Sequence, residues 1–154
     1  MRKVILFIAV LLTMFSCNKD NSEDSANKFS AEETELLNLL NGRWEKEDNY
    51  SPEVLSFSPY AQKEVIKSSV GGIGYFHGNA IRRFDYLGKQ EEWNMYFDVN
   101  IGKKEIYLYG VEADGTYSIV RTKFYNYKII DNNTIQLHDK SLSQLLVYNY
   151  KRIR

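Results

Sequence analysis

Cysteine, histidine and proline are scarce in this chain of 154 residues, which contains one cysteine, two histidines and two prolines. A single cysteine excludes an internal disulfide, so an apolar core has to stabilise the folded part. The two histidines, His77 and His138, lie far apart in the sequence, and no cysteine cluster accompanies them. A metal site needs three or four ligands at fixed spacing, so we expect neither a metal nor any other cofactor.

Long apolar runs are confined to the N-terminus. Arg2 and Lys3 precede an unbroken apolar run over 4–12, and Ser16 is a small residue directly before Cys17. The apolar stretch is too short to span a bilayer, which takes roughly 20 residues. A basic start, a short apolar stretch and a small residue before a cleavage point are typical of a secretory signal, which we assign to residues 1–16.

The position of Cys17 gives this signal a second meaning. The pattern resembles the bacterial lipobox, in which the thiol receives a diacylglycerol and the new amino terminus is acylated. The resemblance implies a lipoprotein held to a membrane through Cys17, since more than one acyl chain makes a durable anchor. The alternative is ordinary signal-peptidase cleavage, which leaves a free thiol near the mature N-terminus.

Residues 17–28 contain no large apolar side chain, so we expect a flexible tether there. Its acidic residues, Asp20, Glu23 and Asp24, resemble the post-cysteine signals that send Bacteroidota lipoproteins to the outer face of the cell. The alternative is a solvated linker with ordinary charge. The predicted location is therefore the cell envelope, as an outer-membrane lipoprotein that is periplasmic or surface-exposed.

An excess of positive charge is absent as well. The chain has 20 basic and 20 acidic residues, and loss of Arg2 and Lys3 with the signal leaves 18 basic residues against 20 acidic ones. General nucleic-acid binding draws on clustered Lys and Arg, so this balance argues against it.

One short helix is predicted at the start of the folded part, residues 29–154. Ser30 and Glu33 have the spacing of a capping box. Four leucines follow between positions 36 and 40, and Gly42 suits the end of a helix.

Strands are predicted beyond Gly42, because aromatic residues are abundant and turn signals recur at short intervals. The turn signals are Gly71-Gly72, Gly78-Asn79, Gly88-Lys89, Gly102-Lys103, Asp114-Gly115 and Asn132-Asn133. The strand-length segments are Ala80–Tyr86, Glu92–Asn100, Glu105–Val111, Tyr117–Ile130, Thr134–His138 and Leu145–Ile153. A bend or bulge is expected in Tyr117–Ile130, which is long. The stretch Tyr50–Ser69 has no clear pattern, and we expect one strand near Lys63–Ser68.

Short connections make these strands antiparallel, each beside the next. One apolar face per strand is compatible with a closed barrel or a sandwich. A meander after an early helix favours the barrel, because closure removes exposed edges. The predicted fold is therefore all-β, an antiparallel up-and-down barrel of about eight strands preceded by one short helix.

The segment Leu40–Glu45 contains Gly42-x-Trp44 at the change from helix to strand. This resembles the opening of lipocalin-like barrels and, with the lipobox, the small lipocalin-like lipoproteins of Bacteroidota, over residues 36–154. The resemblance implies that Trp44 closes one end of the barrel under a basic side chain of the last strand. Arg152 is the best candidate for that side chain, with Lys151 and Arg154 as alternatives.

Catalytic patterns are absent from the sequence. No Gly-x-Ser-x-Gly elbow is present. We interpret His77 and His138 as surface or strand-end histidines, and Glu91, Glu92 and Asp98 as solvated charges. We therefore expect no enzymatic activity, with hydrolysis as the least favoured hypothesis.

Aromatic side chains are the one indication of a binding function, because tyrosine combines a large apolar ring with a hydroxyl. The candidate cavity residues are Trp93, Phe97, Tyr107, Tyr109, Tyr125 and Tyr127. The alternative is that these rings pack the core or pair across strands. The sequence favours a small apolar or amphipathic ligand. The second hypothesis is an accessory subunit of an envelope assembly, with a filled barrel; no particular protein partner is indicated.

Overall fold

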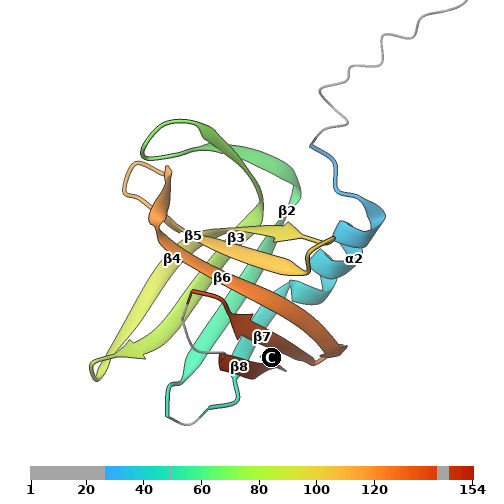
Figure 1. The fold of residues 1–154 in the computed structure, drawn as a ribbon, viewed down its shortest axis with the longest axis vertical. Coiled ribbons are helices and arrows are strands. Elements are labelled where there is room, and N and C mark those ends of the chain that lie inside the picture. The colour runs from blue at the N-terminus through green and yellow to red at the C-terminus, as the bar shows by residue number, and fades with distance from the viewer. Residues whose placement is uncertain (1–26, 49, 142–145) are drawn as a thin grey trace, which may run out of the picture.

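Eight antiparallel strands close into a barrel in which each strand pairs with the next and the last pairs with the first (Figure 1). The structure is a computed structural model that describes residues 27–48, 50–141 and 146–154. A short helix, α2 (Ala31–Leu40), precedes the strands. The strands are β1 (Gly42–Lys46), β2 (Glu53–Lys67), β3 (Ile73–Tyr86), β4 (Lys89–Asn100), β5 (Glu105–Val111), β6 (Tyr117–Asp131), β7 (Thr134–Asp139) and β8 (Leu146–Ile153). The predicted all-β, up-and-down barrel with one early helix is confirmed.

Helix α2 begins with the predicted capping box. The Glu33 backbone N–H donates to the Ser30 hydroxyl at 3.1 Å, and the Ser30 N–H donates to the Glu33 carboxylate at 2.7 Å. Leu36, Leu37 and Leu40 are buried in the barrel core. The helix therefore packs its apolar side against one end of the barrel.

Most of the predicted turns join strands, with glycines at positive φ where the backbone needs it. Gly71 and Gly72 have φ of 97° and 92° between β2 and β3, and Gly115 has φ of 80° between β5 and β6. The predicted bend in β6 is also present, as register shifts in its pairing with β5 and with β7. The prediction of a turn at Gly78-Asn79 is wrong, because both residues lie inside β3.

Gly78 is required for close packing instead. A Cβ at this position would lie 2.4 Å from Cε1 of Phe97 and 2.5 Å from the carbonyl oxygen of Ser58. Glycine therefore lets β3 cross very near to its neighbours. The sequence predicted a turn at Gly78 because glycine is common both in turns and where strands cross closely.

The prediction of one strand near Lys63–Ser68 is also wrong in extent, because β2 runs from Glu53 to Lys67 and β3 begins at Ile73. The pairing of β2 with β3 is interrupted between Pro59 and Glu64. Proline has no N–H for the ladder, so its place is at such a bulge. Beyond it, residues 64–76 form a two-stranded extension, which we call the arm.

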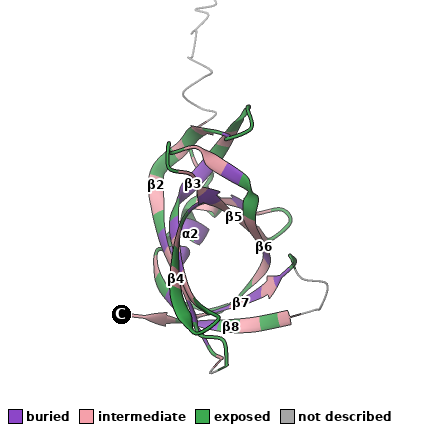
Figure 2. Cartoon of the chain, turned by 90° about the vertical axis from the view of Figure 1, so that its left-hand side faces the viewer, coloured by how far each residue is buried: buried purple, intermediate pink, exposed green. Residues whose placement is uncertain are grey.

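The barrel interior has an apolar part and a charged part. Figure 2 shows the strands as a ring with α2 behind it. Fully buried apolar side chains, among them Trp44, Phe57 and Phe97, fill the part next to α2. The opposite end, which we call the barrel mouth, is lined from the inward positions of six strands by Lys46, Glu53, Arg82, Trp93, Lys123 and Asp139.

Candidate functional site

The residues of the Gly-x-Trp motif meet Arg152 at the closed end of the barrel. The guanidinium of Arg152 lies 4.5 Å from the centre of the Trp44 ring, and Trp44 is fully buried. Arg152 donates to the carbonyl oxygens of Asn41, at 2.8 Å, and of Leu39, at the end of α2. The indole N–H of Trp44 donates to the Leu40 carbonyl at 2.8 Å. Helix, first strand and last strand are thereby joined at one point.

Gly42 lies close to Arg152 at this end, whereas Lys151, one of the two alternatives to Arg152, faces outward. Gly42 has φ of 124°, and a Cβ there would lie 3.2 Å from Nη1 of Arg152. Lys151 instead pairs with Glu47 on the outside, at 2.6 Å. Arg154 is exposed and makes no contact with Trp44 among the described residues.

A buried ion pair lies at the base of the barrel mouth. Arg82 donates to Glu53 at 2.6 Å, and the two residues are 9% and 7% exposed. Burial acts to lower the pKa of Arg82, but the hydrogen bond and charge of Glu53 outweigh it and raise that pKa. The Nε atom of Arg82 is buried without a hydrogen-bond partner.

Two buried tyrosines complete the contacts of Glu53. Tyr150 donates its hydroxyl to Glu53 at 3.0 Å, and Tyr125 does so at 3.4 Å. Burial first, and then the Glu53 charge, raises the pKa of both phenols well above the ordinary value. Both hydroxyls therefore stay protonated and act as donors.

A hollow of about 530 Å³ opens above this ion pair. It is lined by Arg82, Phe84, Tyr86, Glu91, Trp93 and Lys123. The Arg82 guanidinium lies 3.9 Å from the centre of the Phe84 ring, whose edge-on partner is Trp93. Lys123 is paired with Asp139 at 3.0 Å. The site thus offers aromatic faces beside charges that are already paired.

The predicted cavity residues lie in different parts of the structure. Trp93 lines the hollow, and Tyr125 lies beneath it on Glu53. Phe97 is fully buried in the core, edge-on to Phe57. Tyr127 is half-buried and packs against the core, with its N–H donating to Lys104 in a turn at the α2 end.

The prediction that Tyr107 and Tyr109 line the cavity is wrong. Their neighbours Ile106 and Leu108 point inward, so the alternation of β5 places both tyrosines on the outer face. Tyr107 stacks there on Phe124 at 4.7 Å. These rings pair across strands outside the barrel, as the alternative interpretation had it.

Sequence reasoning missed the charged residues of the mouth. The signal that could have found them is the period of two along each strand. Glu53 is two positions before Leu55, Arg82 is two after Ala80, and Asp139 is two after Leu137. Each therefore continues an inward-facing row.

His77 is not a surface histidine, so that interpretation is wrong; it is 2% exposed inside β3. Its Nδ1 lies 2.7 Å from Asp98 and its Nε2 lies 3.1 Å from Glu33, while Phe29 stacks on the ring. His138 is half-buried at the penultimate position of β7, so its interpretation as a strand-end histidine is confirmed. His77 therefore joins the start of α2 to the barrel wall.

The contribution of Glu33 to the stability of this junction depends on pH. Burial raises the pKa of Glu33, but hydrogen bonds from Lys63, the Ser30 backbone and His77 outweigh it and lower the pKa from 4.5 to about 2. A lowered pKa stabilises the fold fully above pH 4.5, and this stabilisation is lost as the pH falls toward 2.

We expect Glu33→Gln to be less stable than the wild type at neutral pH. Glutamine still fills the capping box but has no charge for Lys63. The difference in unfolding free energy should shrink between pH 4.5 and 2, measured by urea denaturation at several pH values. Glu35→Gln, on an exposed position of the same helix, is the control for helix charge. A difference that stays constant with pH would contradict the role of the Glu33 charge.

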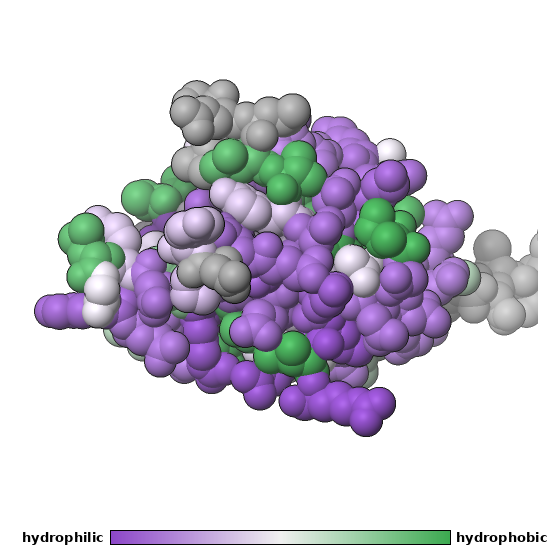
Figure 3. All heavy atoms as spheres, turned by 90° about the horizontal axis from the view of Figure 1, so that it is seen from below, coloured by the Kyte–Doolittle hydropathy of each residue, from purple (hydrophilic) through white to green (hydrophobic). Residues whose placement is uncertain are grey.

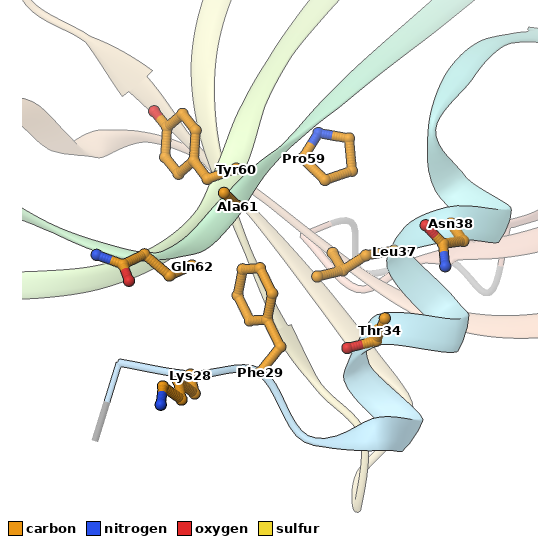
Figure 4. A pocket seen from close by; sticks show the side chains of 9 residues that line it. All are labelled: Lys28, Phe29, Thr34, Leu37, Asn38, Pro59, Tyr60, Ala61 and Gln62. Atoms are coloured by element: carbon orange, nitrogen blue, oxygen red, sulfur yellow. The ribbon is translucent and has the colours of Figure 1, made fainter. Parts of the chain in front are cut away.

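A second hollow, of about 430 Å³, lies between α2 and the bulge of β2 (Figure 4). Phe29 and Leu37 face Pro59 and Ala61 across it. It is lined by residues of α2 and β2, among them the polar side chains of Thr34, Asn38, Tyr60 and Gln62, with Lys28 at its edge. Lys28 is the one charged residue in this lining, whereas Arg82, Glu91 and Lys123 line the hollow at the barrel mouth.

The fold and the mouth define the class of protein: a closed, lipocalin-like antiparallel barrel with one end sealed by a helix. No protein-family model, curated protein or solved structure matches the chain.

In the part of the chain that the structure describes, no helix is long and apolar enough to cross a membrane. The same residues contain no group of three or more His, Cys, Asp or Glu side chains placed to hold a metal ion. Cys17, the signal predicted at 1–16 and most of the tether predicted at 17–28 lie outside the described residues.

Proposed function

We propose that this chain is a lipid-anchored lipoprotein of the bacterial envelope, similar to the lipocalin-like lipoproteins of Bacteroidota. Its barrel binds a small amphipathic molecule at the mouth and performs no chemistry on it. The observation that carries the proposal is the hollow at the mouth, where Trp93 and Phe84 stand beside Arg82 and Lys123. Ligand sites combine apolar walls with a few convergent polar groups in this way.

We propose a position for the ligand from the residues that line the hollow. Its apolar part lies against Trp93, Phe84 and Tyr86, which line one side of the hollow. Its polar group lies at the edge of the hollow, beside Glu91 and beside Lys123, whose ammonium group also contacts Asp139 and Ser141. The packed core around Phe97 and Met95 keeps the ligand in the outer part of the barrel.

Titration with 1-anilinonaphthalene-8-sulfonate, an amphipathic probe, tests the binding function. We expect saturable enhancement of its fluorescence, and Trp93→Ala should weaken binding by about tenfold, or ~1.4 kcal/mol, through loss of the indole face. Tyr107→Ala, which removes an aromatic ring from the outer face, is the matched control and should bind like the wild type. Absence of saturable binding, or an equal loss in both variants, would contradict the proposal.

The accessory-subunit hypothesis has one observation in its favour, namely that the barrel interior next to α2 is packed with apolar side chains. Such a protein works through its surface rather than its interior. Cross-linking in cells followed by recovery from envelopes separates the two functions, because only the accessory subunit requires a constant protein partner.

A further inference from the structure

The arm (residues 64–76) packs against the barrel through one of its faces. Phe76 is 2% exposed and packs against Tyr96, Tyr109 and Tyr117, with ring centres 5.0–5.4 Å apart. At the tip, the Ser69 N–H donates to the Tyr117 carbonyl at 3.0 Å. The arm is therefore a fixed part of the surface.

The other face of the arm presents apolar side chains to solvent. Val65 pairs with Tyr75 across the arm, and Ile73 is two positions from Tyr75, so the three share one face. The exposed fraction is 46% for Val65, 50% for Tyr75 and 57% for Ile73. Val70, at the tip of the arm, is 68% exposed. Exposed apolar groups that lie together mark a contact surface.

The charged side chain on this face of the arm is basic. Glu64, the acidic residue of the arm, pairs with Phe76 and therefore lies on the opposite face. Asp98 lines a neighbouring hollow together with Tyr75. Residues 65–75 and the adjoining start of β6, residues 117–122, contain no acidic residue. Their charged residues are Lys67 and Arg121, and both are exposed. Apolar side chains next to basic ones are suited to the interface of a membrane that contains anionic lipids.

The start of the described chain lies beside the base of the arm. The Lys63 N–H, at the base of the arm, donates to the Asn27 carbonyl at 2.8 Å. Figures 1 and 2 both show the start of the described chain and the arm at the same end of the molecule. Asn27 is ten positions after Cys17, and an extended chain spans at most roughly 3.5 Å per position. A lipid on Cys17 therefore keeps Asn27, and with it the base of the arm, within ~35 Å of the bilayer.

The opposite side of the molecule has a different character. Figure 3 shows that side as a mostly hydrophilic surface, with its apolar residues in separate groups. The β3–β4 turn, with Leu87 exposed at 87%, belongs to the lower end of the molecule in Figure 1. Leu87 is thus an exposed apolar residue that is remote from the arm.

We propose that the arm is a second membrane contact, which inserts Val70, Ile73 and Tyr75 into the lipid interface and orients the barrel on the bilayer. The proposal rests on acylation of Cys17, which is part of the proposed function. The partner is the lipid surface itself, recognised by apolar burial and by the attraction of Lys67 to anionic headgroups.

The test uses the full acylated protein, purified from membranes and reconstituted into vesicles of three parts phosphatidylethanolamine to one part phosphatidylglycerol. Ile73→Cys and Leu87→Cys are each labelled with a polarity-sensitive fluorophore, since acylation blocks the thiol of Cys17. We expect the label at 73 to shift its emission to the blue and to be quenched by lipids brominated on their acyl chains. The label at 87 should show neither effect.

Three further outcomes are distinguishable. Equal emission and equal quenching at the two positions, with the mass of the acyl groups present, would overturn the arm contact alone. A mature protein without acyl mass would overturn the lipoprotein proposal itself. A label at 73 that stays unquenched in vesicles but shifts to the blue in native envelopes would overturn the lipid contact in favour of a protein partner.

Discussion

Replacing Glu53 by Gln is expected to lower the free energy of unfolding by about 3–5 kcal/mol, because it breaks a buried ion pair in the barrel mouth. The substitution leaves the Arg82 guanidinium buried without its counter-charge. It also weakens the acceptor that serves the Tyr125 and Tyr150 hydroxyls. Urea denaturation followed by tryptophan fluorescence measures the change.

An exposed ion pair formed by the residue next to Arg82 provides a matched control. Arg83 pairs with Glu92 at 2.5 Å, but these side chains are 36% and 49% exposed. Exposed pairs contribute about 0–1 kcal/mol, so Glu92→Gln should have little effect. The double variant Glu53→Leu/Arg82→Met should be more stable than Glu53→Gln, because it removes both buried charges. Equal losses for Glu53→Gln and Glu92→Gln would contradict this account.

Replacing Arg152 by Met is expected to lower the free energy of unfolding by about 2 kcal/mol. Methionine retains an apolar stem over the Trp44 ring but has no guanidinium. The carbonyls of Leu39 and Asn41 then lose their donor, and the end of α2 is no longer joined to β8. Thermal unfolding followed by circular dichroism measures the change.

Lys151→Met is the control for Arg152→Met. It lies on the next position of the same strand and carries the same charge, but its side chain is 59% exposed and faces Glu47 outside the barrel. We expect no measurable change in its unfolding midpoint, because an exposed pair contributes little. A loss of stability in Lys151→Met equal to that in Arg152→Met would mean that net charge, and not the contact with Trp44, is responsible.

The fold could be predicted from the sequence because its signals are local. Ser30 and Glu33 define the helix start, and the turn residues around Gly88 and Gly115 space the strands. The failures have a common cause. Gly78 and Pro59 mark a place where two strands cross closely and a ladder breaks, and the same residue types also mark turns. Only the neighbouring chain segments distinguish the two cases.

The candidate site was predicted less well, because aromatic character alone does not give the direction of a side chain. Trp93 and Tyr125 do belong to the mouth, whereas Tyr107 and Tyr109 lie outside. The charged residues of the mouth were missed because buried charges are rare in general. Their burial is possible because each has its partner on another strand, such as Glu53 on β2 for Arg82 on β3.

The sequence by itself determined the all-β class, the helix before it and the succession of antiparallel strands, since periodicity, capping and turn chemistry act over a few neighbouring residues. It also contains Cys17 and the N-terminal apolar run from which the signal and the membrane anchor are predicted. The tertiary structure alone decided which charges converge at the barrel mouth, where His77 is buried, and which face of the arm meets solvent. These features depend on barrel closure, which brings residues from distant parts of the chain into contact.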